Sequence, residues 1–258
     1  MNGVIRFEAY GDVGLVTIDR PERRNALNGE LCAQLRDVLA DNSDQRAVVI
    51  TGAGTAFCAG ADLVTRFEPG AEGEAVVDTF RPSFEEALDA ITAYRAPVIA
   101  AVNGPAIGAG MQLAVACDLR VAGPNARFAI PGGKLGVHLS PKNIWRLVLL
   151  VGQGAARDFL LAGRSVDVDE AMRLRVVERA SDDAVRDAMA VAGEIAASAP
   201  LTMQGHKRAL NLVAEAQWLS PDAQAEIAAL ERAAFTSEDL QEGMAAFAEK
   251  RPPSFRGR

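Results

Sequence analysis

The chain has 258 residues, and its 27 Lys and Arg against 34 Asp and Glu give a formal net charge of −7 at pH 7. Its 49% hydrophobic and 24% charged residues are ordinary for a globular protein and exclude disordered, collagen-like and coiled-coil chains. An acidic surface repels phosphate, so we expect no nucleic-acid partner. A compact chain of this length buries roughly three quarters of its unfolded surface, so its core needs neither a disulfide nor a metal.

The use of cysteine and histidine is typical of a protein from a reducing compartment. The three cysteines are an odd number, lie far apart and form no C-x-x-C pair. His138 and His206 have no partner at metal-ligand spacing, so we expect no structural metal. The N-terminus lacks the pattern of a signal peptide, and apolar runs such as Pro97–Val102 are too short to span a bilayer. We therefore expect a cytoplasmic protein with no membrane span.

The first half of the chain alternates predicted strands and helices. Strands are expected at Val13–Ile18, Ala47–Thr51 and Pro97–Val102, each followed by a turn that contains Gly or Asn. Between the first two strands, Asn28–Ala40 carries apolar residues at helical spacing. This alternation favours an α/β layered fold. Phe67–Glu74, which contains a proline and two glycines, is predicted to be either the rim or lid of a pocket or a plain surface loop.

Predicted helices dominate the second half of the chain. Ser140-Pro141 and Ser220-Pro221 each place an N-cap residue before a proline at the first helical position. One further strand is predicted at Val176–Ala180. We place a soft boundary near Ala199, which gives a core of residues 1–199 and a helical segment of residues 200–258. No Gly/Ser or Pro-rich linker separates them, so the segment is expected to pack on the core or on another subunit.

The segment that follows the second predicted strand is rich in small residues. It runs through Gly52 and Gly54 into Ala59-Gly60-Ala61, where a backbone can approach a ligand closely. Phe57 stands where a dinucleotide fingerprint needs its third glycine, and no Gly-Lys-Ser/Thr follows. These departures exclude the Rossmann and P-loop motifs, and small turns of this kind are structural in most proteins.

A second such turn follows the third predicted strand. Asn103-Gly104 ends the strand, and Gly108-Ala109-Gly110 precedes a predicted helix at Met111–Ala116. The N–H groups and the positive dipole end at a helix start favour a negative charge that develops on oxygen. Two such turns, with one N–H donor each, can form an oxyanion hole. Spacing alone does not show that the two turns meet.

These two segments resemble the paired oxyanion-hole motifs of the crotonase, or enoyl-CoA hydratase/isomerase, superfamily. The resemblance covers nearly the full length, from Ile18–Asn28 through Cys117–Ala122 to Phe247–Phe255. It implies an α/β fold, a crotonase-type spiral of β-β-α units with a helical C-terminal trimerisation segment. It therefore also implies a homotrimer or hexamer.

The resemblance further implies which residues form the site. The N–H groups of the hole belong to Ala61 and Ala109, and Ala109 replaces the usual glycine but keeps its N–H. Lys250 is expected to reach a phosphate from a neighbouring helix or subunit. No prosthetic group is implied, and coenzyme A enters as part of the substrate or ligand. The residues implied to bind coenzyme A are Arg24, Ala26, Ala59, Ala61, Asp62, Leu63 and Lys250.

The sequence departs from the active hydratases at both catalytic positions. Those enzymes use two glutamates, and the corresponding positions hold Gln112 and Gly132. A positioned general acid or base contributes about 10²–10⁴ in rate, and neither residue can replace it. His138, six residues after Gly132, is interpreted either as a substitute base near neutral pH or as a packed side chain. Lys134 and Asn143 are weaker candidates.

Within the superfamily, the chain most resembles hydratase-like proteins of actinobacterial lipid metabolism that lack the glutamate pair. It shares their motifs at Gly104–Ala114 and Glu249–Phe255. This implies a protein that binds fatty acyl-CoA, with weak or no hydratase activity, and that presents acyl groups to other lipid enzymes. The alternative is an active enoyl-CoA hydratase, isomerase, decarboxylase or thioester hydrolase with another base such as His138. Whether the chain is an enzyme of the lyase class stays open at this point.

Overall fold

The computed structural model describes residues 3–63, 67–68, 77–78, 80–216 and 220–256. Its main sheet has six strands in the order β1-β2-β3-β6-β8-β11. The first pair is antiparallel, and the remaining neighbours are parallel. The strands are β1 (Val4–Tyr10), β2 (Val13–Asp19), β3 (Ala47–Gly52), β6 (Val98–Val102), β8 (Leu119–Ala122) and β11 (Arg179–Ala180).

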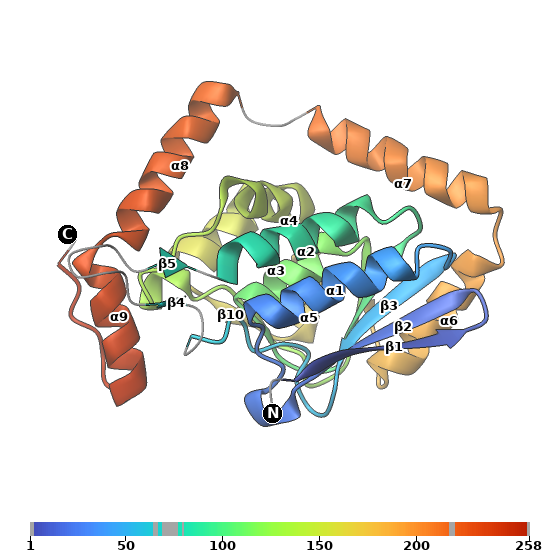
Figure 1. Ribbon diagram of the computed structural model, residues 1–258, viewed down its shortest axis with the longest axis horizontal. Helices are drawn as coiled ribbons and strands as arrows, with labels where there is room; N and C mark the ends of the chain where they lie inside the picture. Colours follow the sequence, from blue (N-terminus) through green and yellow to red (C-terminus); the bar gives the residue numbers. More distant parts are fainter. Residues whose placement is uncertain (1–2, 64–66, 69–76, 79, 217–219, 257–258) are drawn as a thin grey trace.

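Helices cover both faces of this sheet (Figure 1). On one face lie α1 (Gly29–Asp41), α2 (Phe80–Ala93) and α3 (Ala109–Ala116), whose apolar residues form the larger core with Val48 and Ile50. On the other face α6 (Ala184–Ala196) packs against Val49 and Ile99. Side chains alternate across a strand, so a parallel strand covered on both faces is mostly apolar, as is β3, in which every residue is buried.

Smaller elements complete the α/β body. A three-stranded sheet has the order β10-β9-β7, and a short pair joins β4 to β5. The bounds are β4 (Phe67–Glu68), β5 (Val77–Asp78), β7 (Ala106–Ile107), β9 (Phe128–Ala129), β10 (Ser165–Val166), α4 (Pro141–Leu161) and α5 (Val168–Arg173), with short 3₁₀ turns η1 (Pro21–Arg23) and η2 (Gly132–Lys134).

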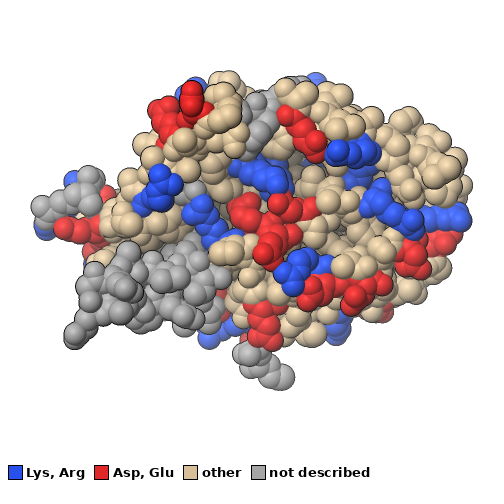
Figure 2. All heavy atoms as spheres, turned by 45° about the horizontal axis from the view of Figure 1, so that its top comes forward, with Lys and Arg blue, Asp and Glu red and all other residues tan. Residues whose placement is uncertain are grey.

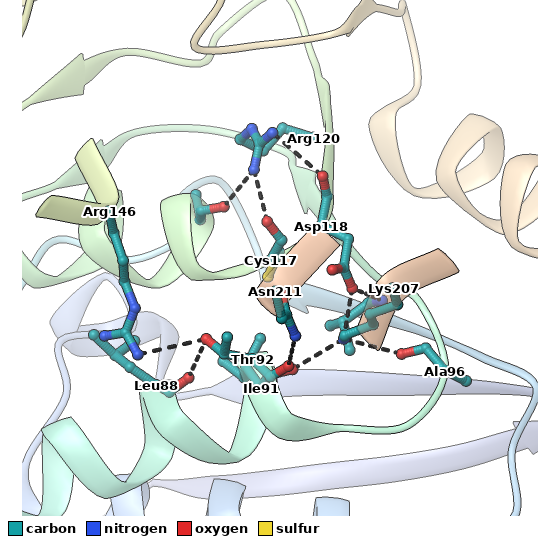
Figure 3. Close-up of polar contacts among 12 residues, drawn as sticks. Leu88, Ile91, Thr92, Ala96, Cys117, Asp118, Arg120, Arg146, Lys207 and Asn211 are labelled. Carbon is teal, nitrogen blue, oxygen red and sulfur yellow. Dashed lines mark hydrogen bonds and ion pairs between the residues drawn. The ribbon is translucent and has the colours of Figure 1, made fainter. Parts of the chain in front are cut away.

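Three C-terminal helices extend from this body: α7 (Pro200–Glu215), α8 (Pro221–Phe235) and α9 (Glu238–Glu249). Figure 1 shows α7 along one side of the protein and α8 and α9 at the opposite end. Buried Lys207 attaches α7 to the core, because its Nζ lies 2.7 Å from the Asp118 carboxylate. The same Nζ donates to the carbonyls of Ile91, on α2, and Ala96, which follows α2 (Figure 3). Asn211 adds a bond to the Thr92 carbonyl at 3.0 Å.

Most of the predicted elements are confirmed. The three early strands and the helix after Asn28 are present, and Ser140 and Ser220 cap α4 and α8 as expected. The strand predicted at Val176–Ala180 is wrong over most of its length. Val176 and Val177 donate to the Ala171 carbonyl and close the end of α5, so only β11 pairs with β8.

The structure also bears on the predicted loop at Phe67–Glu74 and on the three cysteines. Of Phe67–Glu74, the first two residues form β4 and the remainder lies outside the described residues. The three cysteines are buried and unpaired by disulfides, and burial raises the pKa of each thiol. In the described part of the chain, no helix has the length and apolar character to cross a membrane. Nor do those residues include three potential ligands gathered for a metal ion.

Candidate functional site

The two small-residue turns meet in the folded protein. The Cys58 N–H donates to the Pro105 carbonyl, and the Ile107 N–H donates to the Cys58 carbonyl, both at 3.0 Å. Gly110 permits this approach, because a Cβ built there would lie 2.1 Å from the Cys58 oxygen. These bonds bring residues 59–61 beside the start of α3, which spacing along the chain did not show.

Two backbone N–H groups are available where the turns meet. Ala109 is the first residue of α3, so its N–H has no acceptor within the helix. Among the described residues, neither the Ala61 nor the Ala109 N–H donates a hydrogen bond. A Cβ built on Gly60 would lie only 3.8 Å from the Ala109 nitrogen. The arrangement can therefore offer two donors to one oxygen, at a helix start that favours negative charge.

A loop from η1 holds the first turn in place. Leu27 pairs with Ala61 in a parallel bridge, where its N–H donates to the Gly60 carbonyl at 2.8 Å and its carbonyl accepts from the Asp62 N–H at 2.7 Å. The Ala59 N–H donates to the Arg24 carbonyl at 3.0 Å. Since that N–H is engaged, a ligand that contacts the Ala59 backbone would use its carbonyl.

Asp62 itself has a buried cation as its partner. The Arg20 guanidinium lies 2.8 Å from the Asp62 carboxylate, with side-chain exposures of only 8% and 6%. Arg20 also donates to the Ala26 carbonyl at 3.1 Å. The Asn25 side chain closes the same loop by bonding to the backbone of Arg20, Ala53 and Ala56. The ion pair therefore ties the loop that holds Ala26 to the residue next to Ala61.

A cavity of about 370 Å³ lies over the two turns. It is bounded by the turns, by one side of α2 and α3, and by the segment that runs from Ile130 to Ser140. Its wall is largely apolar, which fits an acyl chain. The apolar side chains that line it are Leu63, Phe80, Phe84, Ile107, Ile130, Leu135, Val137, Leu139 and Phe247.

The two positions that lack glutamate both line this cavity. Gln112 lies on α3, one turn after Ala109. Gly132 begins η2, and a Cβ built there would lie 2.5 Å from the Val137 carbonyl oxygen. The Gly132 carbonyl also accepts from the Val137 N–H at 2.9 Å. The loop thus closes over Gly132 so tightly that a side chain requires the backbone to move, which the sequence alone did not reveal.

His138 also lines the cavity and is half-buried. Its Nδ1 lies 2.6 Å from the Leu139 carbonyl oxygen. A carbonyl only accepts, so in the neutral ring Nδ1 carries the proton and Nε2 carries the lone pair. Among the two weaker candidates, Asn143 lines the cavity, whereas Lys134 is not among the described residues that do.

The cavity contains one carboxylate that sequence reasoning missed. Glu85 lies on α2 among the cavity residues, and its Oε1 accepts from the Asn143 Nδ2 at 2.7 Å. In the sequence it is one of several charged residues on an amphipathic helix, and no motif distinguishes it from Glu86. Only the packing of α2 against α4 shows that Glu85 faces the cavity.

The cations expected to bind coenzyme A differ in their position. Arg23 lines the cavity, whereas Arg24 and Lys250 are not among the described residues that do; both adopt left-handed backbone conformations, at the ends of η1 and α9. Arg251 lies 2.6 Å from carboxylates of both Glu242 and Glu249, and its hydrogen bond lowers the pKa of Glu242 to about 2. On the face shown in Figure 2, Lys and Arg alternate with Asp and Glu rather than forming one basic surface.

Comparisons with known proteins agree with this geometry. The model of the enoyl-CoA hydratase/isomerase family matches residues 8–258. The chain is 42% identical over 252 residues to a probable enoyl-CoA hydratase, echA6, of Mycobacterium leprae, and the match covers 95% of this chain and 96% of that protein. It is 38% identical over 253 residues to the 2,3-dehydroadipyl-CoA hydratase of Escherichia coli, with 95% of each covered.

A solved structure gives the same result. Carnitinyl-CoA hydratase from Mycobacterium avium is similar with a TM-score of 0.84 and 33% identity over 99% of both chains. The chain therefore belongs to the enoyl-CoA hydratase/isomerase family. The crotonase-type α/β spiral predicted from the motifs is confirmed, as is the likeness to actinobacterial hydratase-like proteins.

Proposed function

We propose that this protein binds fatty acyl-CoA thioesters and hydrates enoyl thioesters weakly or not at all. The observation that carries the second part is Gly132, whose surroundings leave no room for even a Cβ. With Gln112 at the other position, the site lacks both ionisable groups that water addition needs.

The contacts of the site support one arrangement of the ligand. In it, the Ala61 and Ala109 N–H groups hold the thioester oxygen, and the apolar cavity takes the acyl chain. Arg23, which lines the cavity, contacts the nucleotide part of coenzyme A, and Arg24 and Lys250 are the further cations proposed for its phosphates. Ala26, Ala59, Asp62 and Leu63 form the wall between the two parts of the ligand.

Calorimetric titration with acyl-CoAs of increasing chain length tests this proposal. We expect binding that strengthens over the first carbons, as apolar surface enters the cavity, and then levels off once the cavity is full. Ala26→Glu should weaken binding, and Ala40→Glu, on exposed surface of α1, is the matched control. Free coenzyme A binding as tightly as every acyl derivative, or no binding at all, would contradict the proposed ligand.

A second candidate function rests on His138. Its Nε2 lone pair is available in the cavity, so an active isomerase, decarboxylase or thioester hydrolase that uses this base is the competing proposal. His138→Ala distinguishes the two, because an enzyme dependent on this base loses about 10²–10⁴ in rate. Unchanged turnover of every acyl-CoA that reacts with the wild type would eliminate this candidate.

The expected assembly and partners are further proposals. Large apolar side chains are exposed on α7, where Leu201 is 85%, Leu210 69% and Val213 61% exposed. Exposed apolar side chains of this size favour burial against another copy, which supports a homotrimer or hexamer. Light scattering across a dilution series measures this state, and a monomer at micromolar concentration would refute it. An acyl-presenting role toward other lipid enzymes is the broader proposal that follows from binding without turnover.

A further inference from the structure

Among the residues that the structure describes, no cation pairs with the Glu85 carboxylate in the cavity. The described residues that line the cavity include two carboxylates, Glu85 and Asp62, and Asp62 is paired with buried Arg20. Arg81, one turn before Glu85 on α2, also lines the cavity, and its guanidinium lies over the Phe235 ring at 5.5 Å. Glu85 therefore differs from Asp62, because its charge in the cavity is not offset by a described cation.

A buried hydrogen-bond network fixes the orientation of Glu85. The Asn143 Nδ2 donates to Glu85 Oε1 at 2.7 Å, and the Asn143 Oδ1 accepts from Arg146 Nη1 at 2.8 Å. Because a guanidinium only donates, the second bond settles which end of the Asn143 amide faces Glu85. Arg146 in turn binds the Asp89 carboxylate at 2.6 Å. It also donates to the Thr92 hydroxyl on α2 at 3.4 Å (Figure 3).

The network leaves one oxygen of Glu85 available. Oε1 is held by Asn143, whereas Oε2 has no hydrogen-bond partner among the described residues. Glu85 lines the same cavity of about 370 Å³ as Ala61 and Ala109, so a short acyl thioester held by those two N–H groups shares this cavity with the Glu85 carboxylate. Glu85 belongs to α2, so this base is independent of the positions held by Gln112 and Gly132.

We propose that Glu85 is the catalytic base of this site and that the protein exchanges the α-hydrogens of bound acyl-CoA with solvent. This inference rests on the proposed acyl-CoA site. Glu85 Oε2 takes a proton from Cα, the C–H electron pair forms the Cα=C bond, and the carbonyl π pair moves to the thioester oxygen. The Ala61 and Ala109 N–H groups stabilise that oxyanion. Return of a proton from the carboxyl group, after it exchanges with water, completes a step with no net oxidation.

Exchange requires less of the site than hydration does. Removal and return of one proton need one base and the oxyanion hole, without an activated water or a second carboxyl group. The site has these two parts, which reconciles a formed hole with the loss of both hydratase glutamates. The positioning residue Asn143 orients the carboxylate, because its Nδ2 donates a hydrogen bond to Oε1.

Deuterium incorporation into butyryl-CoA in D₂O, followed by mass spectrometry, tests the proposal. We expect α-deuteration with the wild type, and a loss of about 10²-fold or more with Glu85→Gln. Glu86→Gln is the matched control, because Glu86 is the next residue on α2 and pairs with Arg36 at the surface. Calorimetry should show that Glu85→Gln still binds butyryl-CoA.

Two further variants separate the roles. Asn143→Ala should lower the exchange rate at saturating butyryl-CoA and leave its apparent KM unchanged, because Glu85 loses the donor that orients it. His206→Ala, on exposed surface of α7, should keep the exchange rate. Exchange by Glu85→Gln within about threefold of the wild type would overturn the role of this residue. Binding without exchange by the wild type would overturn the inference alone, whereas absence of binding would overturn the proposed function as well.

Discussion

Restoring the two missing glutamates should not restore a hydratase. A Cβ at position 132 lies 2.5 Å from the Val137 oxygen, and ordinary contact begins at 3.4 Å, so the backbone must move by 3.4 − 2.5 = 0.9 Å. Overpacking of this kind costs about 1–3 kcal/mol. The movement also shifts Val137 and His138, which line the acyl cavity. Gly132→Glu should therefore be destabilised and should bind acyl-CoA more weakly.

The matched control is the neighbouring glycine. A Cβ at Gly133 meets nothing within 4 Å, so Gly133→Glu should lie within about 0.5 kcal/mol of the wild type. Denaturant unfolding gives both stabilities, and loss of the conjugated enoyl absorbance of crotonyl-CoA gives the hydration rate. Crowding at Gly132 would not be the barrier to hydration if Gln112→Glu combined with Gly132→Glu kept wild-type stability and hydrated crotonyl-CoA with a kcat on the order of 10 s⁻¹ or more.

Three further predictions concern the ion pair, the hole and the thiols. Arg20→Met removes the buried cation that lies beside the Asp62 carboxylate and should cost about 3–5 kcal/mol in denaturant unfolding. Arg6→Met, which breaks a partly exposed pair, should cost at most about 1 kcal/mol, and equal losses would be inconsistent with this role for Arg20. Ala109→Pro removes the N–H at the first position of α3, where proline is compatible with a helix, so the fold should be retained. The rate of α-hydrogen exchange should fall by about 10²–10³. An unchanged rate would show that the Ala109 N–H is not part of the oxyanion hole. Burial raises the pKa of Cys58 and Cys117 to about 12, so both should resist a thiol reagent at pH 8 until the protein unfolds. The unfolded thiols ionise first, so stability should fall as the pH rises above about 8.5, and fast labelling of the native protein would contradict this.

The sequence predicted the elements that are defined by local pattern. Ala47–Thr51 is a mostly apolar run that ends in a turn, which predicts a buried strand. Ser140-Pro141 predicts the start of a helix, because Ser140 is an N-cap residue and Pro141 follows at the first helical position. The run at Val176–Ala180 misled, because its valines are buried as the end of α5 rather than as a strand. An apolar segment indicates burial, but its hydrogen-bond partners are set by tertiary packing.

The site was predictable only where motifs carried it. The positions of Ala61 and Ala109 follow from the resemblance, but their proximity depends on the bridge between Cys58 and Ala106, two residues 48 positions apart. The crowding of Gly132 depends on the path of the loop to Val137. Glu85 carried no signal at all, because the helical pattern of α2 is the same whether a polar residue faces solvent or a cavity.

The most direct test of binding without efficient hydration is the turnover of crotonyl-CoA at a concentration that calorimetry shows to saturate the protein. We expect full occupancy with a kcat at least about 10²-fold below the 10–10³ s⁻¹ of ordinary enzymes. A kcat within that ordinary range at saturation would contradict it.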